Sequence, residues 1–101
     1  MILEFNWKVK NLGGEETRVI AKNGLLTVFD FSSAKEKPYL DKKRDWARSI
    51  IKDGKIEPDE TDAKKIIEWI DTADNVYDFI KIALRSYIQE RIDQCTPKDK
   101  K

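Results

Sequence analysis

Residues 2–10, ILEFNWKVK, alternate apolar and polar side chains with a period of two residues. Successive side chains of a β-strand point to opposite faces of the sheet, so this pattern predicts a strand with one buried and one solvated face. We expect Glu4, Asn6 and Lys8 to face water. The apolar side chains that should face the rest of the domain are those of Leu3, Phe5, Trp7 and Val9.

Two further strands are expected after this first one. Segments 17–22 and 25–31 flank the dipeptide Asn23-Gly24. Asn-Gly is the strongest short signal for a tight β-hairpin, because both residues tolerate positive φ angles. Residues 2–31 are therefore predicted to form a three-stranded antiparallel meander.

The remainder of the chain carries the spacing of three amphipathic helices. The first is expected at about 38–52, with Gly54 placed to cap its C-terminus. The second is expected to begin near residue 58, and the third to span about 74–94. The apolar stripes of the second and third helices are out of phase by roughly 100° on the helical wheel. This mismatch predicts a break at residues 72–75.

Together these elements predict an α+β fold, in which the three-stranded antiparallel N-terminal meander packs on three C-terminal α-helices. A chain of 101 residues is the size of one domain with one core. Residues 1–95 are expected to form this single α+β domain, and residues 96–101 a frayed basic tail.

The charge of the chain changes sign midway. Residues 35–55 contain eight basic and four acidic side chains, a net charge of +4. Residues 56–78 contain two basic and eight acidic side chains, a net charge of −6, while the whole chain carries only +1. Segregation of this kind creates a dipolar surface, which steers a charged partner toward one face.

Enzymatic chemistry lacks its usual groups in this sequence. There is no histidine, the commonest general base and metal ligand near neutral pH, and the single thiol, Cys95, has no imidazole to activate it. Neither the Walker spacing nor the dinucleotide-binding glycine fingerprint occurs. The carboxylates of the acidic segment lack the spacing of a calcium loop, and a solvated helix face explains them. We therefore expect a protein that is not an enzyme, with no catalytic residues, no cofactor and no metal ion.

The sequence carries no signal for export or membrane insertion. It opens without the basic stretch and apolar run of a secretory signal. No window approaches the run of about 18 apolar residues that spans a bilayer. A single cysteine suits a reducing compartment. We expect a cytoplasmic protein that does not enter a membrane.

The leading hypothesis is a small protein-interaction module that acts as an adaptor, inhibitor or assembly factor. It follows from the segregated charges and the missing catalytic groups, and compact intracellular proteins of this composition are frequent in phages and mobile elements. The expected partner-binding residues lie on the acidic face and are Glu57, Asp59, Glu60, Asp62, Glu68, Trp69 and Asp71. Trp69 lies about 60° outside the apolar stripe of its helix, which leaves open whether it is exposed or covered by another element.

The alternative hypothesis is a nucleic-acid-binding accessory protein. Lysine and arginine side chains along one helix neutralise phosphates and release counterions. Asp41 and Asp45 dilute this stripe, and the near-neutral charge of the chain is far from the strongly basic footprint of a dedicated binder. The expected contacts are Lys35, Lys37, Lys42, Lys43, Arg44 and Arg48.

A further possibility is self-association through the third expected helix. Its first half, residues 76–84, is apolar almost all round, so it needs cover on several sides. It is either the central helix of a monomer or half of a homodimer contact. Three strands and two shorter helices supply enough apolar surface to cover it, so the central position is favoured.

Overall fold

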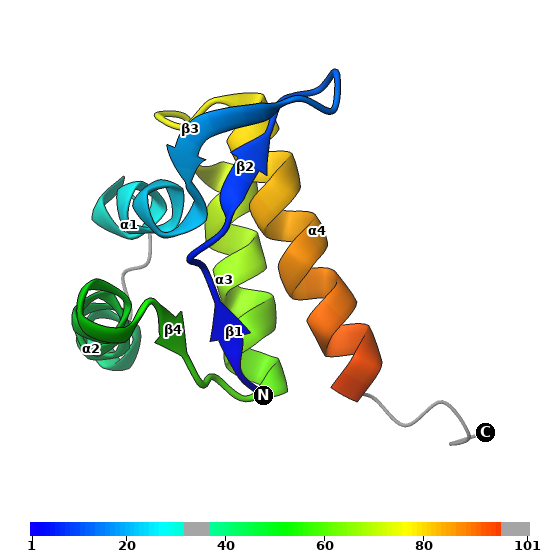
Figure 1. Cartoon of the computed structure of the whole chain (residues 1–101). Helices are drawn as coiled ribbons and strands as arrows, with labels where there is room; N and C mark the ends of the chain where they lie inside the picture. Colours follow the sequence, from blue (N-terminus) through cyan, green and yellow to red (C-terminus); the bar gives the residue numbers. More distant parts are fainter. Residues whose placement is uncertain (32–36, 96–101) are drawn as a thin grey trace.

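The computed structural model describes residues 1–31 and 37–95, and the expected tail at 96–101 lies outside them. Over the described residues the fold is α+β, as expected, with four helices and two small antiparallel sheets (Figure 1). The elements in chain order are β1 (Leu3–Glu4), β2 (Lys8–Lys10), β3 (Glu16–Ile20), α1 (Ala21–Phe31), α2 (Lys37–Asp53), β4 (Lys55–Ile56), α3 (Glu60–Thr72) and α4 (Asp78–Cys95).

The N-terminal segment joins elements that lie far apart in the sequence. β1 pairs with β4, with Leu3 opposite Ile56, and β2 pairs with β3. Between the two sheets, the Phe5 N–H donates to the Gly54 carbonyl, and the Phe5 carbonyl accepts from the Lys22 N–H, both at 2.8 Å. The segment is therefore hydrogen-bonded to the α2–β4 connection on one edge and to β3 and α1 on the other.

The helix α4 fixes the same segment from a third direction. The Tyr87 hydroxyl accepts a hydrogen bond from the Glu4 N–H at 2.9 Å, and Arg91 Nη2 donates to the Ile2 carbonyl at 3.2 Å. The Tyr87 ring also lies 5.5 Å from the Phe5 ring in an edge-to-face contact. These contacts hold the start of the chain against the C-terminal half of α4.

The predicted alternation of buried and exposed side chains is confirmed. The polar side chains of Glu4, Asn6 and Lys8 are exposed, and Trp7 is half-buried. The other apolar side chains of the segment are fully buried, namely Leu3, Phe5 and Val9. The strand itself is interrupted between β1 and β2, because the segment changes pairing partners there.

The predicted three-stranded meander is wrong, because Asn23 and Gly24 lie inside helix α1 rather than in a hairpin turn. The buried residues of α1 have helical spacing and are Ala21, Leu25, Val28 and Phe29. Gly24 faces α4, where a Cβ atom would lie 2.6 Å from Ile80 Cγ2. The glycine therefore permits a close helix–helix approach, a role that the Asn-Gly pattern does not reveal.

The expected ends of the other helices agree with the structure more closely. Gly54 follows α2 with a positive φ of 72°, and its N–H donates to the Ile50 carbonyl at 2.8 Å, as a C-terminal cap should. Asp59 caps α3, since its carboxylate accepts from the Asp62 N–H at 2.8 Å.

The predicted break between the last two helices is confirmed. α3 ends at Thr72, and Ala73 is extended with φ −73° and ψ 128°. α4 begins at Asp78, later than the expected start near residue 74. The Thr72 hydroxyl donates back to the Glu68 carbonyl at 3.0 Å, so it bonds within its own helix instead of capping the next one.

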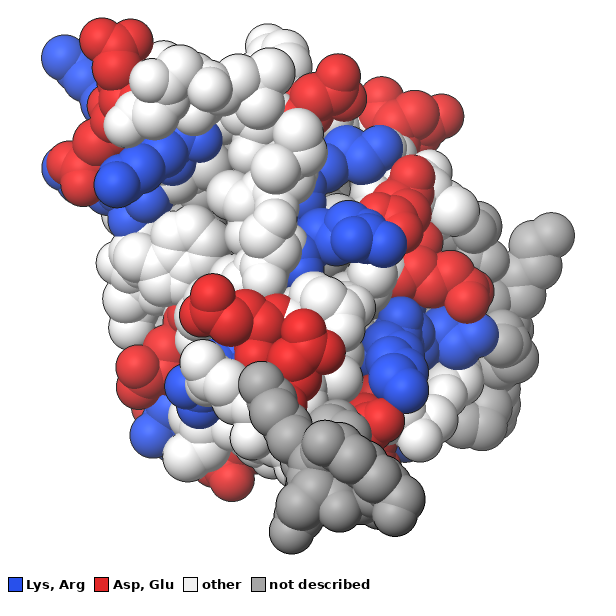
Figure 2. Space-filling model, turned by 90° about the vertical axis from the view of Figure 1, so that its right-hand side faces the viewer, with Lys and Arg blue, Asp and Glu red and all other residues white. Residues whose placement is uncertain are grey.

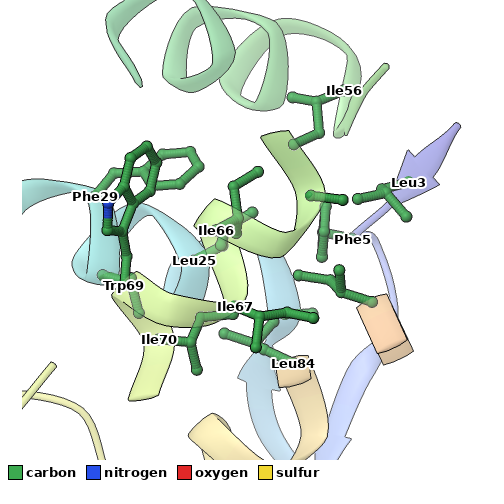
Figure 3. Packing of buried hydrophobic residues seen from close by; sticks show 14 of the residues in the cluster. Leu3, Phe5, Leu25, Phe29, Ile56, Ile66, Ile67, Trp69, Ile70 and Leu84 are labelled. Atoms are coloured by element: carbon green, nitrogen blue, oxygen red, sulfur yellow. The ribbon is translucent and has the colours of Figure 1, made fainter. Parts of the chain in front are cut away.

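The helix at the centre of the molecule is α3, whereas the favoured sequence interpretation put the last helix there. α3 lies between α1 and α2 on one side and α4 on the other (Figure 1). Figure 3 shows side chains from β1, α1 and α4 gathered around it. α4 buries a single stripe, made of Ile80, Leu84, Ile88 and Ile92, and its opposite side is open.

A substitution at Gly24 tests the close approach of α1 to α4. Alanine in a helix gains about 1 kcal/mol of propensity over glycine. Here we expect Gly24→Ala to lower the free energy of unfolding instead, on the order of 1 kcal/mol net, because overpacking costs about 1–3 kcal/mol. Urea denaturation measures the change. The matched control is Asn23→Ala, at an exposed position of the same helix; equal stabilisation by both substitutions would contradict the close approach.

Candidate interaction surface

The acidic residues singled out from the sequence are distributed over the start and the outer sides of α3. Glu57 and Asp59 are exposed in the segment before it. Most of the others pair with a basic side chain: Glu60 with Lys64, Asp62 with Lys42, Glu68 with Lys65 and Asp71 with Arg85. Much of the negative charge of this segment is thus balanced within the domain.

The pair of Lys42 and Asp62 connects α2 to α3. Lys42 Nζ donates to both carboxylate oxygens of Asp62, at 3.1 and 3.0 Å. The Asp62 side chain is only 11% exposed, while that of Lys42 is 46% exposed. The hydrogen bond from Lys42 to Asp62 raises the pKa of the Lys42 ammonium above 10.5. This pair is part of the fold and does not leave Asp62 open to a partner.

Trp69 is covered by other elements of the domain, which decides the question that its position on the helical wheel left open. Trp69 is only 3% exposed. The ring lies 6.0 Å from that of Phe29, 5.7 Å from that of Tyr39 and 6.1 Å from that of Trp46, and Figure 3 shows it beside Phe29. Trp69 is therefore a core residue that joins α1, α2 and α3.

The basic residues singled out from the sequence do not form a continuous exposed stripe. Lys42 is paired with Asp62, and the buried Lys43 places its ammonium 5.2 Å from the centre of the Trp69 ring. Burial lowers the pKa of Lys43 below 10.5. Arg44 lies between two aspartates, with Asp41 and Asp45 each 3.8 Å away.

The remaining basic positions add little to that stripe. Arg48 is exposed on α2. Lys35 and the side chain of Lys37 lie outside the described residues. Among the basic residues that the structure describes, those of α2 are used mainly in contacts with the domain itself, so the geometry lends the nucleic-acid alternative little support.

An open surface with exposed apolar side chains lies where α4 meets the β2–β3 hairpin. Ile82 is 52% exposed on α4, and Leu12, in the hairpin turn, is 72% exposed. Both line one shallow cavity of about 410 Å³. Figure 2 shows this side of the molecule, where a band of uncharged side chains runs between groups of charged ones.

We call this surface the α4 outer face. Its uncharged residues are Leu12, Phe79, Ile82, Ala83 and Ser86. Its charged rim, which lines the same cavity as Leu12 and Ile82, consists of Asp71, Asp78, Lys81 and Arg85.

Two of the rim residues are held by contacts with the end of α3. Lys81 Nζ donates to the Ala73 carbonyl at 2.8 Å, and Arg85 Nε donates to Asp71 Oδ1 at 2.9 Å. A cation at this position also interacts favourably with the C-terminal end of the α3 dipole. Lys81 and Arg85 are therefore ordered by the fold rather than by a partner.

Leu12 was missed in the sequence, although a signal for it exists. It is a large apolar residue between Asn11 and the two turn glycines, where polar residues are usual. Ile82 was recognised only as part of a helix that needed cover on several sides. Their meeting at one surface depends on how the hairpin lies over α4, which local patterns do not specify.

A metal site, a reactive thiol and a membrane-spanning helix are the other features that the described part of the chain could offer. Residues 1–31 and 37–95 contain no group of three or more metal-ligating side chains. Cys95 is a free, exposed thiol. None of the helices within the described ranges is long and apolar enough to cross a membrane.

No family model, curated protein or solved structure matches this chain.

The Lys42–Asp62 pair provides a prediction about stability. We expect Lys42→Met to lower the free energy of unfolding, because it leaves a nearly buried carboxylate without its ammonium partner. The control Arg44→Met removes two longer, exposed contacts and should change the stability much less. Urea denaturation of both variants at pH 7 makes the comparison.

The pH dependence of the same pair has a definite sign. The folded-state pKa of Lys42 is raised, so its stabilising contribution is complete below the unfolded value of 10.5 and is lost as the pH rises above it. The difference between the parent and Lys42→Met should therefore shrink above pH 10.5. A difference that stays constant into that range would show that the ammonium charge is not the cause.

Proposed function

We propose that this chain is a non-enzymatic protein-interaction module, an adaptor, inhibitor or assembly factor, whose contact surface is the α4 outer face. The observation that carries the proposal is the exposure of Leu12 and Ile82 side by side on one cavity, at 72% and 52%. Large apolar side chains that gather at the surface of a small domain mark sites of contact.

The arrangement of this surface resembles the anatomy of protein interfaces. Its apolar residues have charged side chains beside them, and two of these, Lys81 and Arg85, are held by contacts with the end of α3. Apolar centres exclude water and supply binding energy, while a charged rim sets orientation and specificity. Lys81 and Arg85 are already held by Ala73 and Asp71, so they lose little conformational freedom when a partner binds.

The acidic segment has a supporting role in this proposal. Glu57 and Asp59 are exposed at the start of α3, where they can steer a basic partner during approach. Asp62 and Trp69 are buried, so they are not part of the proposed contact. The single free thiol is compatible with a reducing compartment, and we place the module in the cytoplasm.

Site-specific photocrosslinking in the cell of origin tests the proposal. A benzophenone amino acid at Ser86, on the α4 outer face, should form a discrete covalent adduct with a protein. The same group at Arg48, an exposed position on α2, should not form that adduct. Ile82→Asp should abolish the adduct at Ser86, because a charge at the apolar centre resists desolvation.

Two results would contradict the proposed contact surface. One is the absence of any adduct at Ser86 in a folded, expressed chain. The other is an adduct that survives Ile82→Asp and appears equally from Arg48, which would indicate random encounters.

A further inference from the structure

The α4 outer face contains both acidic and basic side chains, so two copies of this face can pair opposite charges with each other. Asp78 and Arg85 lie on the same side of Ile82, about 40° and about 60° from it around the helix at roughly 100° per residue. All three line one cavity. The charged rim of that cavity contains two acids, Asp71 and Asp78, and two bases, Lys81 and Arg85, so it has no net charge to repel an identical surface.

We propose that the occupant of this face is a second copy of the same chain, with its α4 antiparallel to the first. With a rise of about 1.5 Å per residue, Asp78 lies about 6 Å before Ile82 and Arg85 about 4.5 Å after it. A two-fold axis beside Ile82 then brings Asp78 of one copy level with Arg85 of the other. The same rotation brings Arg85 of the first copy level with Asp78 of the second, so the contact occurs twice.

The direction of the second helix follows from where these residues lie. A two-fold axis perpendicular to α4 keeps the Asp78–Arg85 side of one helix against the same side of its mate. In a parallel pair the two-fold axis runs along the helices. The Asp78–Arg85 side of one helix then lies diagonally opposite the Asp78–Arg85 side of the other, which separates the opposite charges. Only the antiparallel arrangement therefore pairs Asp78 with Arg85.

The other side of Ile82 provides complementary shapes. Phe79 is half-buried there, while Ala83 and Ser86 are small. Distances along the helix are measured from the two-fold axis. In the antiparallel pair, Phe79 lies about 4.5 Å from the axis, and Ala83 and Ser86 of the second copy lie at about 1.5 and 6 Å in the same direction. Phe79 therefore lies level with the gap between them. A large side chain thus meets two small ones, as in the packing of knobs into holes.

The charged groups that this pairing needs are accessible. Asp78 makes no ion pair with any residue that the structure describes. Arg85 uses Nε for its hydrogen bonds to Asp71. The four N–H groups on its terminal nitrogens can still reach a carboxylate of the second copy.

Sedimentation equilibrium of the full chain over a range of concentrations gives the first test. We expect the parent to be a dimer whose dissociation constant rises with salt, and Ile82→Asp to be a folded monomer by circular dichroism. Ile82 is half-exposed, so the folded monomer should survive this change. A parent that is monomeric up to its solubility limit would overturn the inference, as would an Ile82→Asp variant that remains dimeric.

A charge-reversal pair gives a sharper test of the geometry. Asp78→Arg alone and Arg85→Asp alone each oppose like charges across the axis, so each should weaken the dimer by about tenfold or more. An equimolar mixture of the two variants restores both pairs of opposite charges. We expect this mixture to form heterodimers of nearly parental affinity, which native mass spectrometry resolves.

The mixing experiment also separates this pairing from a structural effect of the substitutions. Loss of fold in either variant would prevent rescue in the mixture, and circular dichroism identifies that case. The neutral variants Asp78→Asn and Arg85→Gln then replace the charge-reversal variants. Each neutral variant is expected to weaken the dimer less. A mixture of folded variants that stays as weak as its components would overturn the Asp78–Arg85 contact.

This inference rests on the proposed contact surface, but the two can fail separately. A monomeric parent whose Ser86 position crosslinks to a different protein overturns the second copy and leaves the proposed function standing. A monomeric parent with no adduct at Ser86 overturns both.

Discussion

The hydrogen bonds along both edges of the N-terminal segment are the constraint on which the other elements depend. Phe5 donates to Gly54 and accepts from Lys22, so one residue joins the end of α2 to the start of α1. The fully buried side chains of Leu3, Phe5 and Val9 fill the space that these bonds define. At about 1.5–3 kcal/mol for each buried side chain, their contribution is comparable with the whole stability of a small domain, about 5–15 kcal/mol.

Much of this fold is predictable wherever neighbouring residues determine the outcome. The alternation of residues 2–10, the glycine cap after α2 and the break after Thr72 all depend on local spacing, and the structure has each of them. The Asn-Gly hairpin prediction was wrong because a glycine can permit either a tight turn or a close approach between two helices. At Gly24 it admits Ile80, 56 positions further along the chain, and no local pattern records that contact.

The candidate site was less predictable than the fold, because it depends on which charges find partners in three dimensions. Lys42 and Asp62 belong to opposite charge blocks and neutralise each other across α2 and α3. Trp69 lay at the edge of its apolar stripe, and its cover comes from Phe29, Tyr39 and Trp46 on two other helices. Conversely, Leu12 and Ile82 are separated by seventy residues of sequence and meet only when the hairpin lies over α4.

The attachment of the first strand to the last helix also has a consequence for synthesis on the ribosome. Glu4 is bonded to Tyr87 and Ile2 to Arg91, which are 83 and 89 residues later. At about 5–20 residues per second, translation takes several seconds or more to reach them. Until α4 has been made, β1 lacks its contacts with Tyr87 and Arg91, although β4 precedes α4 in the chain and can already pair with β1. An open strand edge can associate with other chains. The nascent chain therefore exposes the part of β1 that later contacts α4, for a time set by the separation of these two elements in the sequence.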